Sequence, residues 1–209
     1  EGLPMARGRA AFCDVFTEEG VFSLEESEKL LLAARAEGFK LKMHADEIVP
    51  LGGAGLAAKL GATSADHLLK ASDDDLLAMR GAGVVATLLP CTAFSLREPY
   101  ARGRFMIDSG LAVALGTDFN PGSCYTQSVP LMIALATIYM NMTIDEALTA
   151  VTLNAAAAIG RADSIGSLES GKQADIVILD CPGYKHLSYH FAMNLVETVI
   201  KAGVIVRGN

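Results

Sequence analysis

Three residues whose side chains commonly bind metal ions each stand at the end of a predicted strand. His44 and His67 end two short apolar segments, and Asp118 ends the apolar run at residues 111–117. Imidazole nitrogen and carboxylate oxygen are ligands of catalytic zinc and of non-haem iron, whose sites keep a position open for water. Together these residues predict a metal centre. Taken singly, each has a structural alternative, because such histidines often only donate hydrogen bonds and a loop aspartate often bonds its own turn.

Glu47 is a further residue that can take part in chemistry. It lies three residues after His44 in the sequence His-Ala-Asp-Glu, so it stands just beyond the same strand end. A carboxylate at this place can contact a substrate or transfer a proton. The alternative is an acidic loop residue that faces solvent, and the residue types alone leave both readings open.

A repeated succession of helix, glycine and short apolar strand must position these residues. The first predicted helix covers residues 23–37, where Ser23 and Glu26 match a capping box and Gly38 follows the last turn. Further helices are predicted at residues 55–60, 73–80, 104–109, 129–141 and 143–159. The predicted strands cover residues 12–16, 39–43, 62–65, 84–89 and 111–117.

Strands that alternate with helices favour a parallel sheet with right-handed crossovers, so the carboxyl ends of the strands open on one rim. His44, His67 and Asp118 are therefore predicted to converge there. A closed (β/α)8 barrel needs eight units, and this chain supplies about the last five. We predict an α/β fold, in which a partial (β/α)8 TIM-type barrel is followed by strands of a small β-sandwich domain.

The small domain is predicted from two β-rich segments late in the chain. Residues 166–180 and 196–207 combine β-branched runs with hairpin-like glycines. We therefore place the barrel part at residues 1–160 and the small β-sheet segment at residues 161–209. His186 and His190 fall in the second part, and we interpret them as structural.

Composition and charge limit the classes of function. The chain has 209 residues, of which 51% are hydrophobic, and a formal charge of −7 without a basic cluster, which argues against nucleic-acid binding. Its longest apolar run, at residues 129–140, is too short to span a bilayer, so no membrane association is expected. Four well-separated cysteines and the lack of a signal-peptide pattern favour a cytoplasmic protein with reduced thiols.

Several motifs of this chain resemble those of the imidazolonepropionases of histidine degradation, a family within the amidohydrolase superfamily. They include Lys-Met-His-Ala-Asp-Glu at residues 42–47, Ser-Ala-Asp-His at 64–67 and Gly-Thr-Asp-Phe-Asn-Pro-Gly at 116–122. The resemblance extends over essentially the whole chain. The Asp-Phe-Asn-Pro-Gly loop is specific to the family, whereas Gly-Lys-Gln-Ala-Asp-Ile-Val at 171–177 marks the superfamily only.

The resemblance implies roles for the residues singled out above. It implies that His44 and Asp118 bind one metal ion, zinc or iron, and that His67 lies beside the metal-bound water. It also implies that Glu47 contacts the substrate ring and the attacking water. Glu47, His67 and Asp118 are thus the catalytic candidates, and which of them is the principal base stays open.

The same resemblance implies the substrate and the reaction. Asn120, Gly122 and Ser123 match the loop that holds the carboxylate side chain of the substrate. The implied reaction is hydrolysis of the small molecule 4-imidazolone-5-propanoate to N-formimidoyl-L-glutamate by a cyclic amidohydrolase, which is a homodimer when complete.

One departure from the family pattern is clear, because the family supplies two further metal ligands from a His-x-His motif and this chain contains none. We interpret the chain as the C-terminal portion of such an enzyme, inactive alone. Two alternatives stay open: another amidohydrolase-superfamily enzyme that deaminates a nucleobase, and a non-catalytic fragment without metal.

Overall fold

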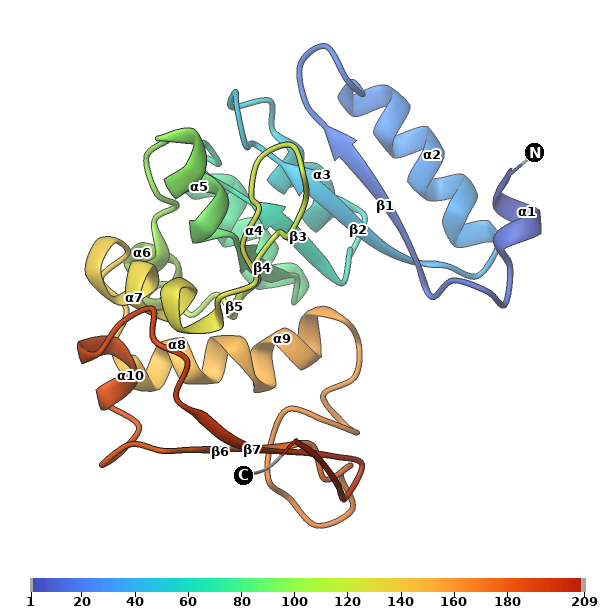
Figure 1. The fold of residues 1–209 in the computed structure, drawn as a ribbon. Helices are drawn as coiled ribbons and strands as arrows, with labels where there is room; N and C mark the ends of the chain where they lie inside the picture. The colour runs from blue at the N-terminus through green and yellow to red at the C-terminus, as the bar shows by residue number, and fades with distance from the viewer. Residues whose placement is uncertain (1, 208–209) are drawn as a thin grey trace. The chain divides into compact units, whose positions relative to one another are not determined.

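The computed structural model describes residues 2–207, and the chain divides into two compact units (Figure 1). Unit 1 comprises Glu1–Leu88 and Pro99–Val113, and unit 2 comprises Leu89–Glu98 and Ala114–Asn209. The helices are α1 (Gly2–Ala6), α2 (Leu24–Ala36), α3 (Gly53–Lys59), α4 (Asp73–Ala82), α5 (Pro90–Leu96), α6 (Gly103–Asp108), α7 (Val129–Tyr139), α8 (Ile144–Val151), α9 (Leu153–Ala158) and α10 (His186–Tyr189). The strands are β1 (Phe12–Thr17), β2 (Lys40–Ala45), β3 (Ser64–His67), β4 (Val85–Leu88), β5 (Val113–Leu115), β6 (Ile176–Leu179), β7 (Val196–Lys201) and β8 (Val204–Arg207).

The larger sheet contains five strands in the order in which they occur along the chain, β1 to β5. The pairs β1–β2, β2–β3 and β3–β4 are parallel. Helix α2 packs on β1 and β2, α3 on β2 and β3, and α4 on β4 (Figure 1). Parallel neighbours joined by helices are what the alternating sequence pattern predicts, and the predicted α/β architecture is confirmed.

Side chains alternate between the two faces of the sheet of unit 1 along each strand, and most of the polar ones lie on the same face. Fully or nearly fully buried apolar residues occupy one set of alternating positions: Val15, Leu41, Met43, Ala65 and Ala86. The strand register aligns the other set in two rows, namely Asp14, Lys42, Ser64 and Val85, followed by Phe16, His44, Asp66 and Thr87. The second row lies nearer the carboxyl ends of the strands and contains His44, a candidate metal ligand.

Local capping signals explain where the helices begin. Ser23 accepts a hydrogen bond from the backbone of Glu26, whose carboxylate accepts one from the backbone of Ser23, so the predicted capping box is present. Thr143 and Glu146 make the same box at the start of α8. Each box satisfies two backbone donors that the first helical turn would otherwise leave without partners.

The helix predicted at residues 143–159 is wrong in one respect, because the structure has two helices there. The chain leaves helical geometry at Thr152, with φ −119° and ψ −91°, between α8 and α9. Gly166, at φ +95°, runs so close to this break that an added Cβ would lie 3.0 Å from the Thr152 carbonyl oxygen and 2.7 Å from the Ala156 Cβ. A distant segment thus passes close to the break, which helical periodicity does not reveal.

The second sheet is antiparallel and contains β6, β7 and β8 in that order. It agrees with the strands predicted for the small domain, whereas the predicted domain boundary between residues 160 and 161 stays a prediction. Among residues 2–207, no helix is both long enough and apolar enough to cross a membrane. Helix α7, which lies within the apolar run, has 11 residues, five of them buried.

Asp175 ties the beginning of β6 to the turn between β7 and β8, and its ionisation gives a testable pH effect. Its carboxylate accepts hydrogen bonds from the Lys201 ammonium at 2.5 Å and from the Ala202 backbone at 2.9 Å. These donors, with Gln173, lower the pKa of Asp175 from 3.8 to about 2. Because the pKa is lower in the folded state, the stabilisation is complete above the unfolded value and is lost as the pH falls toward 2.

We therefore expect Asp175 to titrate near pH 2 in the folded chain, and Lys201→Met to move its pKa back toward 3.8. Carboxyl ¹³C NMR measures both values, with circular dichroism reporting that the chain is folded at each pH. Lys40→Met, the same change at an exposed position on β2, is the control and should leave Asp175 unchanged. Titration of Asp175 near 3.8 in the folded unsubstituted chain would contradict the prediction.

Candidate active site

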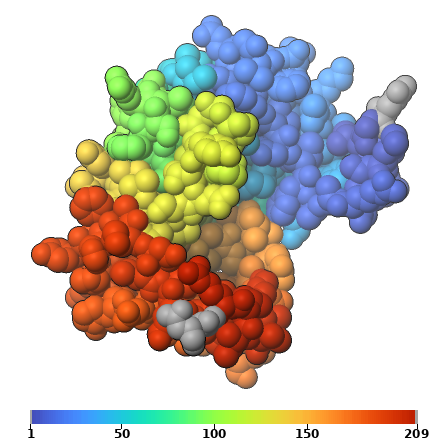
Figure 2. Space-filling view, viewed as in Figure 1, coloured from blue at the N-terminus to red at the C-terminus, as the bar shows by residue number. Residues whose placement is uncertain are grey.

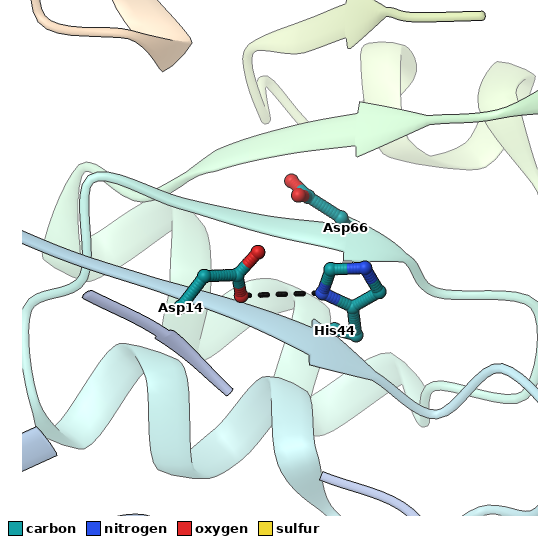
Figure 3. A group of neighbouring side chains, drawn as sticks. All are labelled: Asp14, His44 and Asp66. Atoms are coloured by element: carbon teal, nitrogen blue, oxygen red, sulfur yellow. Dashed lines mark hydrogen bonds and ion pairs between the residues drawn. The ribbon is translucent and has the colours of Figure 1, made fainter. Parts of the chain in front are cut away.

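His44 lies near the carboxyl end of β2 and is flanked by two carboxylates from the neighbouring strands. Its Nδ1 is 3.2 Å from Oδ1 of Asp14 on β1, and Asp66 is its direct partner in the β2–β3 ladder. One ligand atom from each of the three residues lies within 4.8 Å of the others. Figure 3 shows the three side chains on adjacent strands, with the interaction between Asp14 and His44 dashed. His44 is therefore oriented by contacts on its own sheet.

Lys42 supplies positive charge to this group of acids. Its ammonium lies 3.4 Å from Oδ1 of Asp66 and also donates to the hydroxyl of Ser64. Burial raises the pKa of the Asp66 carboxyl above its usual value, and the Lys42 ammonium opposes that shift. The cluster is thus partly neutralised by the protein itself, which weakens the case for Asp66 as a metal ligand.

Sequence reasoning missed the part played by Asp14 and Asp66. Asp66 is a strand residue with only 8% of its surface exposed. The available signal was the polar alternation Lys42-x-His44 and Ser64-x-Asp66, which marks one face of each strand.

Glu47 and His67 lie close together beside His44 in unit 1. Oε1 of Glu47 is 3.5 Å from Nδ1 of His67, and the ring centroids of His44 and His67 are 5.3 Å apart. Glu47 and His67 are buried, with 8% and 2% exposure, so Glu47 is not an acid that faces solvent. The structure thus brings together His44 in β2, His67 at the end of β3 and Glu47 just after β2.

Two buried carboxylates hold the loop that carries Glu47. Glu18 accepts hydrogen bonds from the backbone of Ile48 at 2.9 Å and of Val49 at 3.2 Å. Asp46 accepts from the backbone at the start of α3, at 2.7 Å from Gly52, where the helix dipole favours a carboxylate. Ile48 is 60% exposed, so its side chain does little to anchor the loop, and these hydrogen bonds fix the backbone on both sides of Glu47.

Asp118 follows β5 in unit 2, and its carboxylate is held from outside its own turn. The hydroxyl of Thr92 on α5 donates to Oδ2 of Asp118 at 2.6 Å. The Asp118 backbone has φ +51°, and its carbonyl accepts a hydrogen bond from Nδ2 of Asn120 at 2.8 Å. Asp118 thus has both its main chain and its side chain fixed within unit 2.

The loop after Asp118 is built around the amide group of Asn120. Its Oδ1 accepts hydrogen bonds from the backbone of Gly122 and of Ser123, both at 2.8 Å, and its Nδ2 also donates to the Ser123 hydroxyl at 2.9 Å. An added Cβ at Gly122 would lie 3.3 Å from Asn120 Oδ1, so glycine allows the close approach. This part of the chain lies at the surface (yellow in Figure 2), where Tyr125 is 81% exposed.

The candidates therefore form two groups, one in each unit. The unit 1 group contains His44, Glu47 and His67, and the unit 2 group is Asp118, Asn120, Gly122 and Ser123. The predicted convergence of His44 with Asp118 stays a prediction. One imidazole and one carboxylate, each with a hydrogen-bonded partner on one atom, have the donor chemistry that zinc and iron sites use.

Comparisons with known proteins agree with these residues. The profile described as Amidohydrolase family matches residues 18–206. An imidazolonepropionase of Clostridium tetani is 66% identical over 197 residues, which are 94% of this chain and 47% of that protein. One from Porphyromonas gingivalis is 62% identical over 200 residues, 96% of this chain and 47% of that protein. The chain thus spans about half the length of these relatives.

Solved structures share the fold at low sequence identity. An adenosine deaminase from Xanthomonas campestris with bound zinc superposes with a TM-score of 0.77 at 20% identity, over 90% of this chain and 50% of the other. An ochratoxinase of A. niger gives a TM-score of 0.79 at 22% identity, over 99% and 54%. These likenesses, with the five-stranded and three-stranded sheets, confirm the predicted partial barrel and the separate small β segment.

Proposed function

The chain belongs to the amidohydrolase family, and we propose that it is the C-terminal portion of an enzyme that hydrolyses 4-imidazolone-5-propanoate to N-formimidoyl-L-glutamate. The observation that carries this proposal is the buried group of Glu47 and His67 beside His44. The 66% identity to an imidazolonepropionase supports the choice of substrate. We further propose that the complete enzyme is a cytoplasmic homodimer.

Two ligands of the metal ion are proposed to come from this chain. His44 and Asp118 would hold one zinc or iron ion together with ligands from outside this chain. Bound there, the metal supplies Lewis-acid chemistry that lowers the pKa of water and polarises a carbonyl. The Asp14 carboxylate lies against Nδ1 of His44 and favours a proton on that nitrogen. Nε2 of His44 would therefore be the atom that binds the metal ion.

Proton transfer is proposed to depend on His67, Glu47 and Asp118. Oε1 of Glu47 faces Nδ1 of His67 at 3.5 Å, and this favours a proton on Nδ1 and acceptor character at Nε2. His67 would then accept a proton at Nε2 and return it to the leaving nitrogen. Glu47 would also orient the ring, from a backbone that Glu18 and Asp46 hold in place.

The loop of Asn120, Gly122 and Ser123 is proposed to bind the propanoate side chain of the substrate. Because the amide of Asn120 is hydrogen-bonded within the loop, we assign it the role of shaping the loop.

We expect Asn120→Ala to raise KM about tenfold or more, with a smaller change in kcat. The reason is that loss of an interaction made equally with the bound substrate and with the transition state raises KM and leaves kcat nearly unchanged.

Asn120→Asp is the informative companion variant. It keeps the acceptor for the backbone of Gly122 and Ser123. In the unsubstituted chain the Asp118 carbonyl accepts a hydrogen bond from Nδ2 of Asn120, and the variant places a carboxylate oxygen there instead. It should therefore also raise KM. Steady-state kinetics on the complete enzyme measure both variants, and kinetics unchanged from the unsubstituted enzyme would remove Asn120 from the site.

The test of the proposed function needs the missing half. The complete enzyme is made as this chain preceded by the part of the Clostridium tetani relative that it does not span. Incubation with 4-imidazolone-5-propanoate should yield N-formimidoyl-L-glutamate, which mass spectrometry detects. Ammonia released from cytosine or guanine, with no formimidoylglutamate, would favour the rival nucleobase deaminase. A folded, metal-loaded enzyme inert toward all of these substrates would contradict both.

A further inference from the structure

We propose that Thr92 is a positioning residue for the metal site. Its hydroxyl holds Oδ2 of Asp118 and so directs Oδ1 to the metal ion. The proposal rests on the proposed function only in taking Asp118 as a metal ligand. Its basis is the 2.6 Å hydrogen bond from the Thr92 hydroxyl to Asp118 Oδ2. That distance is at the short end of the range for O–H···O bonds.

Thr92 is itself held rigidly, so its hydroxyl has a defined position. It is 2% exposed and lies in α5, whose first residue is Pro90. Its backbone donates to the carbonyl of Leu89 at 3.1 Å. Because threonine is β-branched, few χ1 rotamers remain available to it in a helix. The donor is therefore fixed by the fold of unit 2 before any metal binds.

The main chain of Asp118 is fixed independently of Thr92. Its φ of +51° is unusual for a residue other than glycine, and Asn120 bonds its carbonyl at 2.8 Å. With the backbone fixed, the remaining freedom of the carboxylate is rotation of its side chain. The Thr92 hydroxyl restricts this rotation by engaging one oxygen, which favours a ligand that binds through the other oxygen only.

Cys91, the residue before Thr92, adds no negative charge beside it. Burial, with Cys124 as a second cause, raises the pKa of Cys91 to about 12, so this thiol is neutral near pH 7. Both cysteines are buried. The Thr92 hydroxyl therefore has no thiolate at the neighbouring position, Cys91, to compete with Asp118 as its acceptor.

Two matched pairs of variants test the proposal in the complete enzyme. Thr92→Val keeps the shape of threonine without the hydroxyl, and unsubstituted Thr92 is its reference. Thr92→Ser and Thr92→Ala both lack the methyl group, and only the alanine lacks the hydroxyl, so this pair serves if the valine variant does not fold. Thermal unfolding of the metal-free proteins establishes which variants fold.

The readouts are the zinc Kd, from competition with a chelator, and the visible absorption of the cobalt(II)-substituted enzyme. We expect loss of the hydroxyl to raise the Kd by about 10- to 100-fold and to change the cobalt spectrum, whereas Thr92→Ser retains both. Equal Kd values and spectra within both pairs would overturn the proposal.

The two readouts require no substrate, so the proposal and the proposed function can fail separately. Changed metal binding in an enzyme that forms no formimidoylglutamate would support the role of Thr92 and contradict the substrate. Product formation with metal binding that is the same in all Thr92 variants would support the substrate and overturn the role of Thr92.

Discussion

Asp118→Asn in the complete enzyme is expected to lower kcat by at least about a hundredfold, the scale on which acid–base groups contribute to catalysis. The variant removes the carboxylate that we propose as both a metal ligand and a proton acceptor. Asparagine tolerates the left-handed backbone that Asp118 adopts at φ +51°. It can also still accept the hydrogen bond from Thr92, so loss of activity should not come from misfolding.

Steady-state turnover of 4-imidazolone-5-propanoate and bound metal per chain are the measurements for Asp118→Asn. Asp163→Asn, the same change at an exposed position in unit 2, is the control and should keep both values. Retention of more than about a tenth of kcat, which is a change of under roughly 1.4 kcal/mol in the barrier, would remove Asp118 from the catalytic set.

His67→Asn should reduce kcat by about 10²- to 10⁴-fold, because it removes the imidazole that we propose accepts and returns the proton. Asparagine is the suitable replacement, since His67 has φ +74° and asparagine accepts a left-handed backbone. Metal content should stay near that of the unsubstituted enzyme, because His67 is not assigned as a ligand. This separates His67→Asn from Asp118→Asn.

The matched control for His67→Asn is His190→Asn, at an exposed histidine interpreted as structural. Its kcat should remain within about threefold of the unsubstituted enzyme. If His67→Asn behaved like His190→Asn in kcat, His67 would be a structural residue and the proton would have to be handled by Glu47 or Asp118.

Features that depend on neighbouring residues in the sequence could be predicted well. The capping box of Ser23 and Glu26 was found because both partners lie within one turn. The strand endings at His44 and His67 follow from short apolar segments, and strand β2 extends one residue past the first of them. Parallel strands with helical connections then allow few arrangements other than neighbours in sequence order.

Features that depend on strand register or distant contacts could not be predicted. The contact of Asp14 with His44 joins residues 30 apart, and that of Thr92 with Asp118 joins residues 26 apart. Neither residue type marks its partner, because aspartate and threonine also suit turns and helix starts. The break at Thr152 likewise lies close to a residue distant in the sequence, Gly166.

We propose that this chain supplies only part of an active site. Its relatives are about twice as long, and the remaining metal ligands are proposed to lie in the half that this chain does not cover. The most direct test measures bound zinc or iron and formimidoylglutamate production for the 209-residue chain alone, and again after mixing with that half as a separate protein. With only His44 and Asp118 as ligands, the chain alone should bind metal weakly and form no product, and the mixture should gain both. Tight stoichiometric metal and full turnover by the chain alone would contradict the account.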